Sequence, residues 1–139
     1  MKIDTEKSKL LANNGWDMNI FAGKLFFKTD TRERKKYYGY DGQQLTQISE
    51  TEFWEVKYGK HFEKIFSVFG EVPNSSIVLT DGTVIATEYK DFYIHIFNPQ
   101  GELIRKIEDV GFDSIYDIAF EPPDGLWCAI PTANAIRKY

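Results

Sequence analysis

Clustered basic side chains are the first feature of this sequence that could do chemistry. Four of them fall in one short run: Arg32, Arg34, Lys35 and Lys36. Guanidinium and ammonium groups bind phosphate and carboxylate groups strongly, so this run suits a phosphate-bearing or acidic partner. A solvated hairpin loop would have the same composition, and both interpretations stay open. The formal net charge of −4 argues against broad nucleic-acid binding.

Aromatic side chains beside carboxylates are the second such feature. Trp16-Asp17 and Phe112-Asp113 occupy corresponding positions before two strand-like segments. Rings at a loop can stack on a ligand, and rings between elements pack instead; both alternatives remain. Polar and aromatic loop residues together form the predicted ligand-binding set: Trp16, Asp17, Arg32, Arg34, Tyr89, Lys90, Phe112, Asp113 and Asn134.

The sequence contains no recognisable catalytic set. His95 alternates with Tyr93 and Phe97 on one strand-like segment, which predicts a packed or edge histidine, and His61 follows a glycine turn that predicts exposure. There is no Ser-His-Asp order, Cys-His pair, phosphate-binding glycine loop or HExxH motif. We therefore predict no catalytic residue, no metal ligand and no cofactor.

Three classes of function remain. Variable loops on a rigid scaffold favour a non-enzymatic module that binds a protein or a small ligand, and this is our prediction. The first alternative is a metal-dependent hydrolase or lyase, whose cation would need carboxylates gathered around a channel mouth. The available carboxylates near the loops are Asp17, Glu88, Asp113 and Asp117. The second alternative is a purely structural part of a larger assembly.

Short strands must position these loops. Residues 77–107 contain runs of β-branched and aromatic residues separated by turns at Asp81-Gly82 and Asn98-Pro99-Gln100-Gly101. This pattern predicts four antiparallel strands. The short glycine-bearing turns lie at one end of such a sheet, and the longer loops at the other end are the expected ligand side. Similar turns recur along the chain, which indicates a repeat.

Two segments carry a resemblance to a known architecture. EYKDFYIHIFNPQGELIRKIEDVG resembles an NHL-type propeller blade, and PPDGLWCAIPTANAIRKY is similar to blades of the streptogramin-lyase-like six-bladed propellers. The resemblance implies an all-β, β-propeller-like domain over 1–139, with about three blades of four antiparallel strands. Its expected parts are blade 1 at about 18–69 with an insertion near 43–59, blade 2 at about 76–108, a partial blade 3 at about 115–139, and an N-terminal strand at 2–11 that completes a blade.

No segment is predicted to form a long helix. The insertion, TEFWEVKYG, predicts an additional strand or hairpin, and HFEKIFSVFG aligns with the fourth strand of blade 1. Closed propellers have typically four to eight blades, so about three blades leave the ring open. Two completions remain: a second copy that exchanges strands and forms a six-bladed homodimer, or the remainder of a longer chain.

The expected compartment is the cytoplasm. Cys128 is the only cysteine, which excludes an intrachain disulfide framework. The N-terminal residues lack the apolar core of a signal peptide, and no apolar run has membrane-spanning length. We expect no membrane partner, and nucleic acid is not an expected partner.

Overall fold

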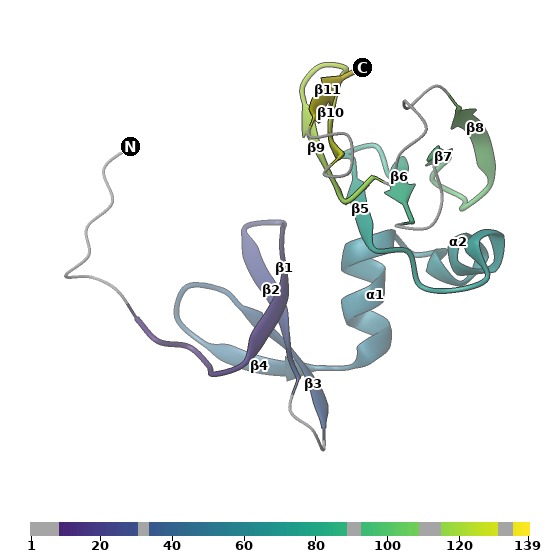
Figure 1. The fold of residues 1–139 in the computed structure, drawn as a ribbon. Helices are drawn as coiled ribbons and strands as arrows, with labels where there is room; N and C mark the ends of the chain where they lie inside the picture. The colour runs from purple at the N-terminus through teal and green to yellow at the C-terminus, as the bar shows by residue number, and fades with distance from the viewer. Residues whose placement is uncertain (1–8, 31–33, 89–92, 109–114, 131–134) are drawn as a thin grey trace. The chain divides into compact units, whose positions relative to one another are not determined.

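The computed structural model describes residues 9–30, 34–88, 93–108, 115–130 and 135–139. The chain divides into two compact units, Met1–Phe53 and Trp54–Tyr139, called the N-terminal and C-terminal units below. Antiparallel sheets form the main regular structure of both units, as Figure 1 shows. None of the described helices is long and apolar enough to cross a membrane.

The N-terminal unit contains a four-stranded antiparallel sheet in the order β1-β2-β3-β4. Its strands are β1 (Gly15–Phe21), β2 (Lys24–Asp30), β3 (Lys35–Tyr40) and β4 (Leu45–Ile48). The β1–β2 turn has positive φ at both central residues, Ala22 and Gly23. Such turns match the twist of the paired strands, so the hairpin forms locally.

Apolar residues occupy both faces of this first sheet. Tyr37 is buried on one face, and its ring centroid lies 5.0 Å from that of Phe53 in helix α1 (Glu50–Tyr58). Phe27 is buried on the other face and stacks on Tyr38, with ring centroids 5.5 Å apart. The Lys9 ammonium group lies 5.5 Å from the Tyr40 ring centroid on this same face, so the segment before β1 runs along it.

The C-terminal unit contains two further sheets and helix α2. The four-stranded sheet has the order β5-β6-β7-β8 and the three-stranded sheet the order β11-β10-β9. The elements are α2 (Phe62–Phe69), β5 (Ser75–Val78), β6 (Val84–Thr87), β7 (Ile94–Phe97), β8 (Leu103–Ile107), β9 (Asp117–Glu121), β10 (Gly125–Ile130) and β11 (Ala135–Lys138).

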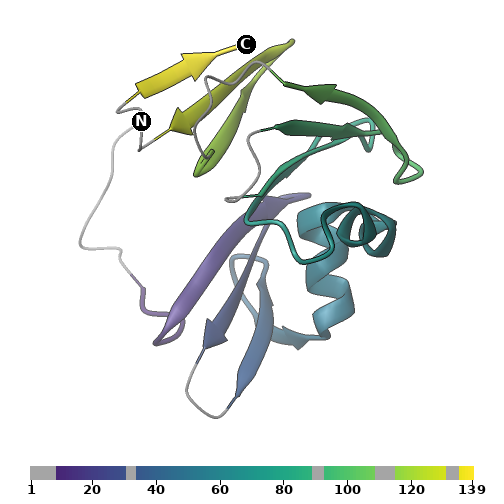
Figure 2. The same cartoon turned by 45° about the vertical axis from the view of Figure 1, so that its right-hand side comes forward.

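The β5–β8 sheet is buried on both faces. On one face, Ile85 and Ile94 pack with Ile118 and Leu126 of the three-stranded sheet. On the other face, Val84, Ala86 and Phe97 pack against Ile65 of α2. Figure 2 shows the three-stranded sheet and α2 on opposite sides of this central sheet. Each fully buried aliphatic side chain contributes about 1.5–3 kcal/mol, so these two layers stabilise the unit.

The predicted all-β fold is confirmed only in part, because the architecture is mostly β and antiparallel but includes the helices α1 and α2. The strands and turns predicted within 77–107 are formed. The two turns close as expected, with Gly82 N–H donating to Leu79 O and Gly101 N–H to Asn98 O, both at 2.9 Å.

The predicted strands between residues 51 and 70 are wrong, because this stretch forms α1 and α2. Phe62, Ile65, Phe66 and Phe69 have helical spacing, which brings them to one face that packs on the sheet. Gly70 ends α2 in the left-handed conformation and donates to Phe66 O at 2.8 Å. In α1, Ser49 Oγ accepts a hydrogen bond from Glu52 N–H at 3.1 Å, as a helix cap does.

The predicted N-terminal strand at 2–11, which would complete a blade, stays a prediction. Residues 9–11 have no strand conformation, and Leu10 is 79% exposed. The rest of that prediction lies outside the described residues.

Candidate ligand-binding groove

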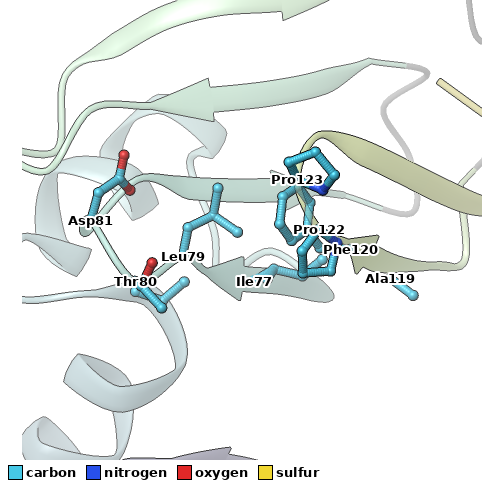
Figure 3. A pocket seen from close by; sticks show the side chains of 9 residues that line it. Ile77, Leu79, Thr80, Asp81, Ala119, Phe120, Pro122 and Pro123 are labelled. Atoms are coloured by element: carbon cyan, nitrogen blue, oxygen red, sulfur yellow. The ribbon is translucent and has the colours of Figure 1, made fainter.

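A groove in the C-terminal unit lies between the ends of β5 and β9. Its volume is about 700 Å³. Figure 3 shows the side chains of both walls. One wall comes from β5 and the turn after it, and the other from β9 and the turn after it. The lining residues are Ile77, Val78, Leu79, Thr80 and Asp81 in the first wall and Ala119, Phe120, Pro122 and Pro123 in the second.

Hydrogen bonds at the beginnings of the two strands position these walls. Ser75 Oγ donates to an Asp117 carboxylate oxygen at 2.9 Å. The Asn74 side-chain amide donates to Tyr116 O, also at 2.9 Å. Because the strands are joined at their beginnings and line the groove with their ends, they run in the same direction.

The turn in the wall formed by β5 is held by its own backbone. Leu79 N–H donates to Thr83 O at 2.8 Å, and Asp81 Oδ1 accepts from Thr83 N–H at 2.8 Å. Gly82 has φ +93°, and a Cβ there would lie 3.0 Å from Pro99 Cβ. The turn therefore needs glycine, and its shape is set before any ligand arrives.

The turn in the wall formed by β9 is held by side chains. Glu121 Oε2 accepts a hydrogen bond from Trp127 Nε1 at 2.9 Å. The same oxygen forms an ion pair with Lys138 Nζ, also at 2.9 Å. The Lys138 ammonium group also lies 5.1 Å from the Trp127 ring centroid. These contacts lower the pKa of Glu121, with the Lys138 contact as the larger cause.

The groove is apolar along its length and polar at one end. Ile77, Leu79 and Phe120 are partly buried, and they continue the core between the two sheets. Asp81 is the one charged residue among the lining side chains that the structure describes. The Thr83 N–H bond holds the pKa of this carboxyl below its usual value, so Asp81 carries its negative charge at neutral pH. An apolar ligand with a hydrogen-bond donor or a cation at one end fits this arrangement.

Three of the predicted ligand-binding residues are described, and they belong to the N-terminal unit. Trp16 is 63% exposed at the edge of its sheet. Asp17 has φ +60° in a β-bulge, and its carboxylate lies 3.9 Å from Lys28 Nζ. Arg34 immediately precedes β3. The other six lie outside the described residues: Arg32, Tyr89, Lys90, Phe112, Asp113 and Asn134.

Sequence reasoning missed the groove because it placed the ligand side at the longer loops. The groove is built by two of the short turns, at the end of the sheets opposite to the longer loops. A signal was present, since LTDG and EPPDG occupy corresponding places in successive repeats. What the sequence did not show is that the two turns face each other.

The remaining chemistry-bearing residues are mostly packed. His95 is 2% exposed, with its ring centroid 4.4 Å from that of Phe69, and His61 is exposed beside α2, both as predicted. Cys128 is buried, which raises the pKa of its thiol to about 11. Within the described ranges, no three His, Cys, Asp or Glu side chains lie close enough to hold a metal ion.

No protein-family model matches this chain, and no curated protein is significantly similar to it.

Proposed function

We propose that this protein is a non-enzymatic binding module whose groove between β5 and β9 receives an apolar segment of a partner protein. The observation that carries this proposal is the groove lining, in which aliphatic, aromatic and proline side chains surround a space of about 700 Å³. Ligand sites are concave, mostly apolar and marked by a few polar groups that orient the ligand. Asp81 supplies that orienting group by attracting a Lys, an Arg or an N-terminal amine.

We also propose a propeller-like arrangement for the two sheets of the C-terminal unit. In a propeller, the first strands of successive blades are neighbours near the axis. The Ser75–Asp117 hydrogen bond, which joins the first strands of two successive sheets, supports this arrangement. On its other face, the β5–β8 sheet is covered by α2, at the place where a preceding blade would pack. The proposed propeller-like arrangement is therefore limited to the β5–β8 sheet and the three-stranded sheet.

A second copy of the chain is the candidate partner for the outer face of the three-stranded sheet. That face carries Trp127, which is 39% exposed, and Ile136, which is 67% exposed, with Ala119 beside Trp127. Apolar sheet faces of this kind serve as interfaces between subunits. A light-scattering mass of one chain at high concentration would contradict this second proposal, and a mass of two chains that Ile136→Lys reduces to one would support it.

The groove proposal is tested by panning the full chain against a displayed library of random peptides. We expect wild-type protein to enrich apolar peptides with a basic residue or a free amine at one end. Thr80→Lys places a cation at the exposed rim beside Asp81 and should abolish this enrichment. Ile104→Lys adds the same charge at an exposed position on β8 and should leave it unchanged. Enrichment that survives Thr80→Lys, or no enrichment by wild type, would contradict the proposal.

A further inference from the structure

The basic run of the sequence is divided by strand β3 between two faces of the first sheet. Successive strand residues point to opposite faces, so Arg34, Lys36 and Tyr38 share one face and Lys35 lies on the other. The register agrees, because Lys36 pairs with Thr29 whereas Lys35 pairs with Asp30. In the described part of the basic run, Lys35 therefore lies opposite Asp30 on one face, and Arg34 and Lys36 lie on the other face.

Arg34 and Lys36 line a cleft of about 320 Å³ in the N-terminal unit. Its remaining walls are neutral and polar or small: Ala12, Asn13, Thr29 and Tyr38. Thr29 lies directly opposite Lys36 on the neighbouring strand, where side chains are about 4.5–5.5 Å apart at their Cβ atoms. The cleft thus combines residues from β2, β3 and the segment before β1 (elements in Figure 1).

The segment before β1 is held beside these strands. Asp30 N–H donates to Asn14 O at 3.2 Å, at the end of β2. Asn14 itself has φ +57°, a conformation that asparagine tolerates better than most residues. This contact fixes the neighbouring Asn13 at the wall of the cleft, so the polar groups are assembled from segments far apart in the sequence.

The donor set of the cleft fits a compact oxyanion. Arg34 and Lys36 supply two positive charges, the hydroxyl groups of Thr29 and Tyr38 can donate to oxygen, and Asn13 adds an amide N–H₂. No carboxylate lies among the described lining residues, so nothing in that set repels an anion. Charge-assisted hydrogen bonds to phosphate oxygens are stronger than neutral ones, and several donors around one point match a phosphoryl group better than a monoanionic carboxylate.

We propose that this cleft binds the phosphoryl group of a phosphate-bearing ligand. The site belongs to the N-terminal unit and uses no residue of the groove between β5 and β9, so either can fail without the other.

The proposal is tested by titrating the ¹⁵N-labelled full chain with inorganic phosphate at constant ionic strength, which keeps the screening of surface charge unchanged. We expect saturable shifts of the Thr29 and Lys36 amide signals. Lys36→Gln should weaken binding by about tenfold, because it removes one charge-assisted hydrogen bond. Arg34→Gln should weaken it similarly.

The matched control is Lys35→Gln, which removes the same charge from the adjacent residue on the opposite face. It should change the affinity by less than about twofold, within the range expected for an exposed charge. If Lys35→Gln and Lys36→Gln weakened phosphate binding equally, the binding would come from general surface charge, and the proposal would be overturned.

Two further probes identify the group that the cleft recognises. O-phosphoserine should shift the same signals as inorganic phosphate, because it carries a phosphoryl group on an ester oxygen, as a phosphate-bearing ligand would. Acetate at equal ionic strength should not. Acetate binding as tightly as phosphate, or failure of O-phosphoserine to bind, would overturn the assignment to a phosphoryl group.

Discussion

Ser75 and Asp117 join two sheets through a hydrogen bond of 2.9 Å between the Ser75 hydroxyl group and an Asp117 carboxylate oxygen. Asp117 Oδ1 also accepts from Ile118 N–H at 2.9 Å, so the carboxylate is oriented by its own strand. Ser75 is almost fully buried. This contact holds the first strand of one sheet beside the first strand of the next and so keeps the walls of the groove together.

Ser75→Ala should therefore lower stability. A hydrogen bond to a charged group contributes about 1.5–3 kcal/mol when its partner remains in place, and the part-buried site places the expected loss near the lower end of that range. Urea unfolding measures this loss. Ser67→Ala, on the exposed side of α2, is the control and should change the free energy of unfolding by less than about 0.5 kcal/mol. Equal effects of the two substitutions would show that the inter-sheet bond contributes nothing.

Ile65→Ala tests the helix that replaced a predicted strand. Ile65 is 1% exposed and packs on Val84 and Phe97, so its truncation should cost about 2–5 kcal/mol. Val68 is 47% exposed on the same helix, and Val68→Ala should cost less than about 0.5 kcal/mol. Thermal and urea unfolding compare the two variants. A larger loss for Val68→Ala would contradict the helical packing.

Gly101→Ala tests a close approach between the β7–β8 turn and α2. Gly101 has φ +80°, and an added Cβ would lie 2.6 Å from His61 Cβ. The matched control is Gly42→Ala in the β3–β4 turn, where φ is +100° and the space is open. The control should lose about 1–2 kcal/mol from backbone strain alone. Gly101→Ala should lose clearly more in the same urea experiment, because it adds a steric clash; equal losses would show that the approach is not tight.

The buried thiol of Cys128 makes the free energy of unfolding depend on pH. Burial raises its pKa to about 11 in the folded protein, against about 8.5 in an unfolded chain. The folded state therefore holds the thiol proton more tightly, so this contribution is fully present below about pH 8.5 and is lost as pH rises toward 11. Cys128→Ala should flatten the decline of unfolding free energy over this range. Rapid reaction of the native thiol with a disulfide reagent at pH 8 would contradict the burial.

Local chemistry in the sequence was enough to predict most strands and turns. Gly82 and Gly101 occur where the chain needs positive φ, and alternating apolar residues such as Ile94 and Ile96 match the period of a strand. The helical spacing of Phe62, Ile65 and Phe69 was equally local, but alignment to the repeat overrode it and gave the wrong element. That error came from the interpretation, since the periodic signal was in the sequence.

Local sequence patterns specify the antiparallel strands, the turns that join them and the basic run. Which segments meet depends on the tertiary structure, which places the β5–β6 and β9–β10 turns across a groove from each other and brings Asn13 and Thr29 to the cleft of Arg34 and Lys36. The two kinds of information differ because the forces behind them act over different distances along the chain. Backbone conformation depends on neighbouring residues, whereas burial brings together side chains such as Leu79 and Phe120 that are far apart along the chain.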